Sequence, residues 1–511
     1  MKLCTCTPRC TVGFIHLLIS SENPQWGVTN NHIALHCIAL YFSIAGCIII
    51  SFGFYHLESK NVEWKWIKTS QIHRCKFQAL LKYARELPDK IKEVNGVRVS
   101  FAQNFSVGQG SDGTAVYIGL AKDGCEKAVK RIHKSSITEN QGSNEQKILN
   151  APNAVNSKRV VRYWYYDEQS DDEFAYLIFD LHEEALKQYV EVQSHETLIE
   201  KAPFIIHQIL EGLVDLHSKP EPILHRDLKP SNILRNVYCE WLLSDFGISR
   251  ILSDGKTTHR SKEIGTQHWR AVESYPFQDK TGKSVADEAR YKKQSDMQVL
   301  GIVCFYILTK GDHPFGLKPD RVRNLLDGKP VDLDKVTDPV AKDLISWMLR
   351  HNPKDRPSAE ESLEHPFLQP SIQQFELLKC LGNEPEIKRN DHTSDVVRKI
   401  NNDPLLSNNT WKSQIHPTYL TYLCSDGIRP RRYGDEWTEC LRLIRNTSQH
   451  WNDRPHPRPE VHDMIGEPDQ YFLNLFPTLP MVLHRIIRND PHWKQRSGLR
   501  KFPTFSSTTY V

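Results

Sequence analysis

The sequence has little net charge, no internal repeat and no paired spacing among its cysteines. Its 66 Lys and Arg residues nearly balance its 62 Asp and Glu residues, which leaves a formal charge of +4 over 511 residues. That charge is too small to indicate nucleic-acid binding by itself, so any such function has to be argued from a site. The twelve cysteines are scattered, apart from Cys4, Cys6 and Cys10 near the N-terminus, which argues against a disulfide framework and is typical of a reducing compartment. A chain of this length is expected to form two or three domains.

One stretch has no charged residue at all. Residues 33–55, "IALHCIALYFSIAGCIIISFGFY", lack Lys, Arg, Asp and Glu, and as a helix they would extend roughly 35 Å, enough to cross a hydrocarbon core of about 30 Å. We therefore predict one transmembrane helix, and the alternatives are a buried helix or an N-terminal extension that is not part of the folded protein. Basic residues are more frequent after this stretch than in residues 1–32 before it, so the C-terminal part is expected to face the cytosol. Residues 1–32 are too few for a sensing domain, and direct recognition of unfolded protein by this chain is not expected.

The rest of the chain changes character twice. Residues 56–100 are a polar, partly helical connector, in which "KFQALLKYARELPDKIKEV" has helical spacing until Pro88. Short β-branched runs around glycine-rich turns follow, and longer helical patterns begin near Pro203. The order of strands and then helices predicts an α+β arrangement of a small lobe and a larger one over residues 101–368. Residues 369–496 are almost wholly helical in pattern, and residues 497–511 form a Ser/Thr-rich tail.

The first chemical motif is glycine-rich. "VGQGSDGTAV" places Gly108, Gly110 and Gly113 in G-x-G-x-x-G spacing, with Val116 three residues beyond. Glycines let a backbone close over phosphates, although this pattern alone also occurs in plain hairpins. Further along, "AVK" ends in Lys130, placed on a strand to hold the phosphates of ATP or ADP.

A carboxylate on the following helix is expected to pair with that lysine. Glu145 in "NEQKIL" is the first choice, and Glu139 is the alternative.

The decisive stretch is "LHRDLKPSNIL", which matches the kinase catalytic loop at every position. Asp227 is predicted to accept the proton of a substrate hydroxyl, Lys229 indicates Ser or Thr as the acceptor, and Asn232 is a metal ligand. Asp245 in "SDFG" is the second ligand for Mg²⁺. With these residues the sequence resembles a eukaryotic protein kinase across residues 101–368, which implies the bilobal kinase fold.

Other kinase features have counterparts here. Asp296 and Arg356 resemble the buried acid and the closing arginine of the large lobe, and Val272 replaces the proline of the usual Ala-Pro-Glu motif. The loop between the "SDFG" motif and this Ala-Pro-Glu equivalent carries hydroxyls that are candidates for phosphorylation, with Arg226 as a partner for the phosphate. These hydroxyls belong to Ser253, Thr257, Thr258 and Ser261.

The helical region after the kinase resembles the kinase-extension nuclease (KEN) domain of the inositol-requiring kinase/endoribonucleases of the unfolded-protein response, and also that of RNase L. The similar blocks are "LLKCLGNEPEIK", "IRNTSQHW" and "IGEPDQYFLNLFPTLPMVLHRII". The resemblance implies that Tyr433, Arg445, Asn446 and His450 form a nuclease site.

These residue types suit RNA cleavage. Attack by a 2′-hydroxyl needs an acid for the leaving oxygen, a group that assists proton removal and a cation for the phosphate. His450, Tyr433 and Arg445 can fill these roles in turn, and no cofactor is expected for the nuclease. Alternatively, Arg445 and Asn446 end a helix and His450 is a surface imidazole.

The resemblance implies a bifunctional Ser/Thr kinase and metal-independent endoribonuclease. Its expected partners are RNA, protein acceptors that include the chain itself, and a second copy in a homodimer or higher oligomer. Residues 33–55 are expected to anchor it as a single-pass protein of the endoplasmic reticulum membrane. Two alternatives remain: a soluble effector similar to RNase L, and a kinase whose C-terminal helices only dock partners.

Overall fold

The computed structural model describes residues 64–109, 114–136, 141–252, 256–261, 265–275, 277–278, 284–286, 289–407, 410–425, 432–451, 459–499 and 502. The predicted membrane stretch, residues 33–55, lies outside these residues. Among the helices that are described, none has both the length and the apolar character needed to span a bilayer.

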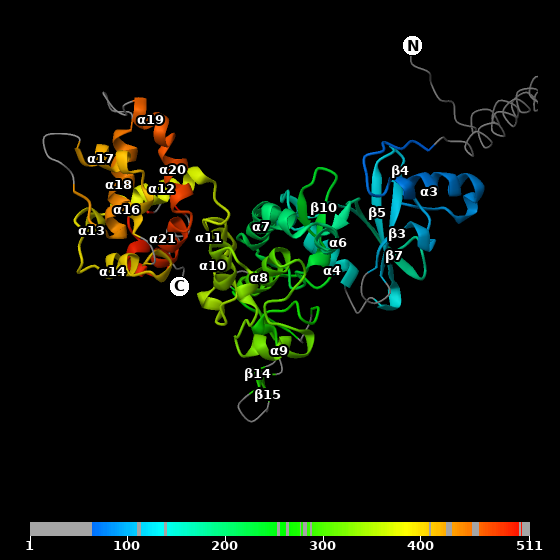
Figure 1. Ribbon diagram of the computed structural model, residues 1–511. Coiled ribbons are helices and arrows are strands. Elements are labelled where there is room, and N and C mark those ends of the chain that lie inside the picture. Colours follow the sequence, from blue (N-terminus) through cyan, green and yellow to red (C-terminus); the bar gives the residue numbers. More distant parts are fainter. Residues whose placement is uncertain are drawn as a thin grey trace, which may run out of the picture. The chain divides into compact units, whose positions relative to one another are not determined.

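An antiparallel sheet forms the small lobe (Figure 1). Its strands follow the order β1-β2-β4-β5-β7-β6, and β3 pairs with β4. One face is covered by an apolar cluster that includes Val99, Val129 and Ile178. The strands are β1 (Lys92–Val94), β2 (Val97–Val99), β3 (Ser106–Gln109), β4 (Ala115–Ala121), β5 (Glu126–His133), β6 (Tyr163–Asp167) and β7 (Phe174–Asp180), and the helices are α3 (Arg74–Glu86), α4 (Gln141–Leu149) and α5 (Pro152–Val155).

The segment before residue 101 differs from the connector expected there. Its helix α3 ends just before Pro88, as the pattern predicted, but β1 and β2 extend the sheet of the small lobe. Phe77 and Leu80 of α3 are fully buried. Much of this segment is therefore part of the small lobe, because its strands pair with the sheet and the apolar residues of α3 are buried.

The large lobe is mainly helical, which confirms the predicted α+β arrangement of two lobes. Its central helix α8 is buried on all sides, as expected of a helix at the centre of a core. Helix α7 begins eight residues before Pro203, which it contains, so the predicted start was late. The helices are α6 (Leu186–Val192), α7 (His195–His217), α8 (Lys293–Leu308), α9 (Lys318–Leu326), α10 (Pro339–Met348) and α11 (Ala359–Leu363).

Short strands and 3₁₀ turns complete the kinase region. The strands are β8 (Glu184–Ala185), β9 (Ile223–Leu224), β10 (Ile233–Arg235), β11 (Trp241–Leu243), β12 (Arg250–Ile251), β13 (His259–Ser261), β14 (Phe277–Gln278), β15 (Ser284–Ala286) and β16 (Ala289–Tyr291). The turns are η2 (Pro88–Lys90), η3 (Gln103–Phe105), η4 (Lys134–Ser136), η5 (Pro230–Asn232), η6 (Val272–Ser274), η7 (Leu333–Lys335) and η8 (Pro353–Asp355).

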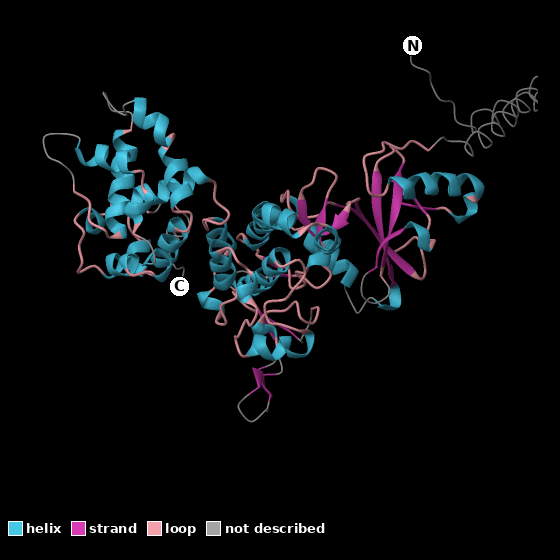
Figure 2. Cartoon of the chain, in the orientation of Figure 1, coloured by secondary structure: helices cyan, strands magenta, loops and turns pink. Residues whose placement is uncertain are grey.

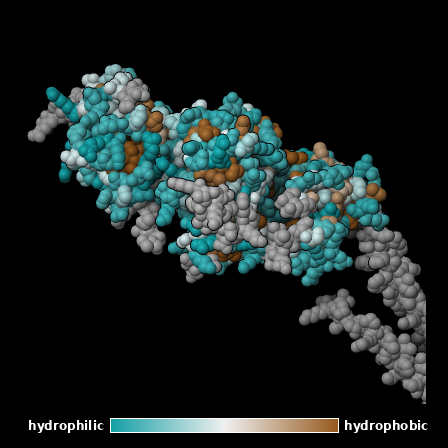
Figure 3. All heavy atoms as spheres, turned by 90° about the horizontal axis from the view of Figure 1, so that it is seen from below, coloured by the Kyte–Doolittle hydropathy of each residue, from teal (hydrophilic) through white to brown (hydrophobic). Residues whose placement is uncertain are grey.

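The C-terminal region is helical in every element described, which confirms the predicted change of character (Figure 2). It has its own apolar core, in which Trp411 and Tyr419 are fully buried. On the face drawn in Figure 3, apolar residues lie in small groups within a mostly hydrophilic surface. The helices are α12 (Ser371–Gly382), α13 (Pro385–Lys388), α14 (Asp395–Asn401), α15 (Pro404–Ser407), α16 (Trp411–Gln414), α17 (Pro417–Ser425), α18 (Trp437–His450), α19 (Pro459–Ile465), α20 (Pro468–Leu475), α21 (Leu479–Arg488) and α22 (Pro491–Lys494).

A buried ionic cluster joins α21 to the large lobe. Arg488 donates to the Asp343 carboxylate of α10 over 2.6 Å, and both side chains are less than a tenth exposed. His365 lies 3.0 Å from the same carboxylate, and the Arg488 guanidinium lies 4.2 Å from the ring centre of Trp347. Because a buried charge without its partner is strongly destabilising, this cluster ties the two regions together.

Candidate functional sites

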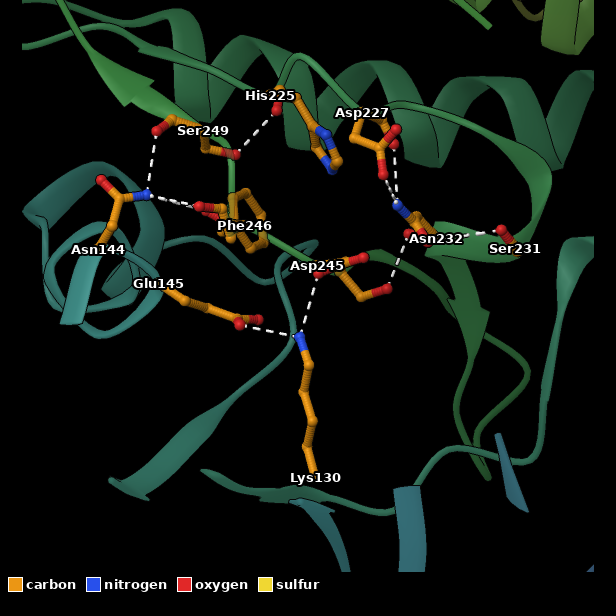
Figure 4. A network of polar contacts seen from close by, with 12 residues as sticks. Lys130, Asn144, Glu145, His225, Asp227, Ser231, Asn232, Asp245, Phe246 and Ser249 are labelled. Atoms are coloured by element: carbon orange, nitrogen blue, oxygen red, sulfur yellow. Dashed lines mark hydrogen bonds and ion pairs between the residues drawn. The ribbon is translucent and has the colours of Figure 1, made fainter. Parts of the chain in front are cut away.

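Lys130 is the centre of the first site. Its ammonium group lies 2.9 Å from Glu145 on α4 and 3.1 Å from Asp245 of the large lobe (Figure 4). Burial disfavours the charge on Lys130, but the carboxylates of Asp245 and Glu145 outweigh it and raise the pKa of Lys130. The lysine in turn lowers the pKa of Asp245. Lys130 and Asp245 therefore stay ionised at neutral pH, whereas burial raises the pKa of Glu145. Glu139, the alternative partner, lies outside the described residues.

The catalytic loop positions Asp227 through a network of donors. Lys229 Nζ and Thr266 Oγ1 each lie 2.7 Å from one of its carboxylate oxygens, and Asn232 Nδ2 lies 3.0 Å from Oδ2. Thr266 also accepts a bond from Lys229 over 2.7 Å. The carboxylate is thus held in one orientation, with a lysine beside it.

Thr266 was missed in the sequence. The signal was its place in "GTQHW", a few residues before the Ala-Pro-Glu equivalent at residues 271–273, where the chain returns to the catalytic loop. Its role follows from contacts across 39 residues of sequence, which no local pattern reveals.

A buried frame supports this loop. Asp296 accepts backbone N–H bonds from His225 and Arg226, each over 3.0 Å, and a bond from His217 over 2.9 Å. Burial alone would raise the pKa of Asp296, but His217 and the other donors lower it. Arg226 adopts a positive φ of 68°, and these backbone bonds hold it there. Arg356, expected to close the lobe, forms a two-pronged pair with Glu273 at 2.8 and 2.9 Å.

The phosphate-binding candidates lie on neighbouring strands. Val116 of β4 is paired with Gly108 on one side and with Lys130 on the other. Gly110 and Gly113 lie outside the described residues. The register therefore places the start of the glycine motif beside the strand that carries the lysine.

Asn232 and Asp245 suit a magnesium ion. The Asn232 amide N–H₂ is used on Asp227, which orients its oxygen away from that carboxylate. The Asp245 side chain remains 42% exposed. Amide and carboxylate oxygens are the ligands that Mg²⁺ prefers, so the donor set fits this metal.

Three basic residues, Arg226, Arg250 and Lys256, lie near His259 in the loop that follows Asp245. The Arg226 guanidinium lies 4.1 Å from the ring centre of Tyr291. Burial, together with Arg226, Arg250 and Lys256, lowers the pKa of His259 to about 4. Thr257 and Thr258 are among the described residues of this loop, Ser261 lies in β13, and Ser253 lies outside the described residues.

The second site lies on α18. Asn446 donates to the Tyr433 hydroxyl over 2.8 Å, and Arg445 donates to Asn446 Oδ1 over 2.5 Å and to Gln449 Oε1 over 3.0 Å. Tyr433 is 7% exposed, whereas His450 is exposed at the end of the helix. Because residues four apart share a helix face, His450 follows Asn446 on the same side. Arg445, Asn446 and His450 therefore lie in the last turns of α18, and Tyr433, which precedes this helix, is joined to them through Asn446.

Gly382 lets α12 approach this helix. A Cβ atom at Gly382 would lie 2.6 Å from the Leu441 carbonyl oxygen and 2.8 Å from the Cβ atom of Arg445. Real side chains do not tolerate such distances, so a larger residue would displace α18. The sequence showed the glycine within "CLGNEPEIK" but not this contact.

Both regions match known families. Residues 101–368 match the protein kinase domain family, which covers just over half of the chain. Residues 374–502 match the Ribonuclease 2-5A family.

Several curated proteins are similar over both regions. The chain is 29% identical to the sensor for unfolded proteins in the ER ire1 of Schizosaccharomyces pombe, over 75% of this chain and 37% of that protein. It is 28% identical to the serine/threonine-protein kinase/endoribonuclease IRE1a of Arabidopsis thaliana, over 79% of this chain and 50% of that protein. It is 30% identical to the serine/threonine-protein kinase/endoribonuclease ire-1 of Caenorhabditis elegans, over 78% of this chain and 40% of that protein. The chain thus spans half or less of the length of these relatives.

Proposed function

The chain belongs to the protein kinase family and continues into a ribonuclease domain of the kind found in the IRE1-type kinase/endoribonucleases, and from that premise we propose that it is a bifunctional enzyme. It phosphorylates Ser or Thr hydroxyls, its own included, and cleaves RNA in the unfolded-protein response. The observation that carries the proposal is the Tyr433–Asn446–Arg445 network, downstream of a kinase region in which Lys130 contacts Glu145 and Asp245.

The kinase reaction uses groups of both lobes. Lys130 and the glycine motif hold the phosphates of ATP, and Asn232 and Asp245 hold the magnesium ion, which neutralises phosphate charge when bound. Asp227 orients the acceptor hydroxyl and takes its proton as the oxygen attacks the terminal phosphorus, and ADP leaves as its bond to that phosphorus breaks. Lys229, 2.7 Å from Asp227, stabilises the negative charge at that point of transfer.

The nuclease reaction uses the face of α18. The 2′-hydroxyl of RNA attacks the neighbouring phosphorus while Tyr433 assists removal of its proton. Arg445 holds the phosphate oxygens, and His450 donates a proton to the 5′-oxygen as that bond breaks. The products are a 2′,3′-cyclic phosphate and a 5′-hydroxyl. Asn446 fixes the phenol oxygen and accepts from Arg445 at the same time, so it aligns the two groups.

Nucleotide binding controls the nuclease through dimerisation. Two copies present their α18 faces to one RNA, so cleavage rises more steeply than linearly with protein concentration. A phosphate on a hydroxyl within residues 253–261 forms ion pairs with the basic residues near His259, which include Arg226 and Arg250.

The chain is placed in the endoplasmic reticulum membrane by residues 33–55, with both catalytic regions in the cytosol. The apolar stretch and the basic residues that follow it support this placement. In sealed microsomes, added protease should remove the kinase region and alkaline carbonate should leave the protein in the pellet. Glycosylation at Asn104 would contradict the orientation.

The decisive experiment is cleavage of a hairpin RNA by the purified chain with ADP, followed by analysis of the cut ends. We expect a 2′,3′-cyclic phosphate, and undiminished cleavage when excess EDTA is added to preformed dimers. A chain that binds ADP and dimerises but leaves the RNA intact would instead be a kinase with a docking domain.

A further inference from the structure

Residues 66–73 lie ahead of the region that matches the kinase family, yet they contact two parts of the kinase. We call this segment the brace. One contact is to β5, the strand that carries Lys130. The other is to the linker, residues 181–183, through which the chain passes from β7 of the small lobe to the large lobe.

Glu126 anchors the brace to the small lobe. Its carboxylate accepts the Trp66 indole N–H over 2.6 Å and the Ser70 backbone N–H over 2.7 Å. Glu126 is 8% exposed and Ser70 is fully buried. Two hydrogen bonds to a buried acceptor hold this end of the brace to the sheet.

Glu183 anchors it to the linker. This carboxylate accepts the backbone N–H groups of Gln71 over 3.2 Å and of Ile72 over 2.6 Å, and it is 6% exposed. Successive turns of one short segment thus bind a strand of the small lobe and the connection between the lobes.

His73 completes the attachment. Its Nε2 atom lies 3.1 Å from the backbone carbonyl oxygen of His182 in the linker. Burial lowers the pKa of His73, so the ring is neutral at pH 7 and carries one N–H. A carbonyl oxygen only accepts, and the proton is therefore on Nε2.

Helix α3 continues from the brace toward the glycine motif. Lys76 donates to the backbone carbonyl of Ser106, at the start of the strand that carries Gly108. The Phe77 ring stacks on that of Trp66 with centroids 5.6 Å apart. The brace and the first turn of α3 therefore contact the lysine strand, the glycine strand and the linker.

We propose that the brace strengthens nucleotide binding by holding the linker in place, with His73 as a positioning residue. Lys130 and Asp227 lie on different lobes, and the linker sets the cleft between them. A linker held by the brace loses less conformational freedom when a nucleotide enters, which favours binding. By linkage, nucleotide must stabilise the brace to the same extent.

The test compares His73→Ala, which removes the donor, with His73→Gln, whose amide keeps an N–H near the position of Nε2. Lys82→Ala, on the exposed side of α3, is the matched control. In the full chain, the Kd of ADP is measured by displacement of a fluorescent nucleotide, and KM and kcat for ATP by peptide phosphorylation. We expect His73→Ala to raise Kd and KM about three- to tenfold, the size of one hydrogen bond, with kcat within about twofold. His73→Gln and Lys82→Ala should bind as the wild type does.

Unchanged ADP affinity in His73→Ala would overturn the proposal, and so would an equal loss in His73→Gln, since packing of the ring would then explain the effect. Hydrogen exchange of the wild-type chain gives an independent measurement that needs no variant. ADP should slow exchange of the Ser70, Gln71 and Ile72 amides, and exchange that ADP does not alter at these residues would also overturn the proposal.

Discussion

The proposed phosphoryl-transfer site and the proposed ribonuclease site of this chain are built in opposite ways. Lys130 and Asp245 meet across 115 residues of sequence, and Lys130, Glu145 and Asp227 are largely buried. Tyr433 and Asn446 are thirteen residues apart, and the rest of the second site lies on one helix that ends in an exposed histidine. The first site depends on the fold to assemble it, whereas helical spacing assembles most of the second.

The comparison predicts that one residue can silence either site without the other. Asp227→Ala should reduce phosphorylation at least about 10³-fold, because the carboxylate that orients the acceptor hydroxyl is lost. RNA cleavage with ADP should persist, since the nucleotide groups remain. Autophosphorylation with labelled ATP measures the effect, with the exposed Asp320→Ala as control. Undiminished labelling in Asp227→Ala would exclude its assigned role.

The converse change is His450→Ala. Loss of the proton donor should slow RNA cleavage about 10²- to 10⁴-fold and leave autophosphorylation at the wild-type level. His492→Ala, an exposed histidine of α22, controls for the loss of an imidazole. A His450→Ala protein that cleaves hairpin RNA at the wild-type rate would return α18 to a purely structural role.

A smaller effect is expected from Tyr433→Phe. The ring stays in its buried place while the hydroxyl that accepts from Asn446 is lost, so cleavage should fall about tenfold, toward the lower end of proton-transfer effects. Initial rates at saturating RNA measure the change, with the exposed Tyr238→Phe as control. Equal rates for the two variants would mean that the phenol oxygen takes no part.

The ionic contact between the large lobe and the C-terminal helical region can be weakened without changing a residue of either site. Asp343→Ala leaves Arg488 buried without its carboxylate partner, which should cost about 3–5 kcal/mol of stability. Denaturant unfolding of the full chain measures it. A paired change, Asp343→Leu with Arg488→Met, should recover most of the loss because no buried charge remains. If the single change is as stable as wild type, the cluster does not hold the regions together.

Stability is also expected to depend on pH through the same ionic cluster. Burial lowers the pKa of His365 to about 4, so the unfolded chain binds a proton there below about pH 6.5 that the folded chain refuses. Stability should therefore fall as the pH drops from 6.5 to 4, by at most about 3 kcal/mol from this residue. His365→Gln, which keeps a donor for Asp343, should show a flatter profile. Parallel profiles for the two proteins would contradict this prediction.

Sequence reasoning reached the two sites to different depths. The kinase motifs identified Asp227, Asn232 and Asp245 because their spacing is set by the chemistry of phosphate transfer. Thr266 was missed because its contact with Asp227 depends on how the chain returns to the loop. The helical spacing of Arg445, Asn446 and His450 could be read locally, but only the preceding kinase gave it meaning.

The fold shows the same division. The order of strands and helices followed from local patterns, since burial sets their periodicity. The packing of residues 66–99 onto the small lobe could not be predicted, because Glu126 and Glu183 meet their backbone donors only after folding. Pro203 was read as the start of a helix that in fact contains it, because tertiary burial of α7 outweighs the lost backbone bond.

The absence of a side chain at Gly382 has a mechanical consequence. Helix α12 leaves the kinase large lobe, where Gln374 donates to the backbone carbonyls of Pro366 and Gln369, and its last residue lies directly against the backbone of α18 and the stem of Arg445. Contacts between long side chains yield by changing rotamer. Gly382 has no side chain and therefore no rotamer to change, so the contact between α12 and α18 is stiff. A displacement of the kinase end of α12 would therefore shift Arg445, the residue proposed to hold the RNA phosphate.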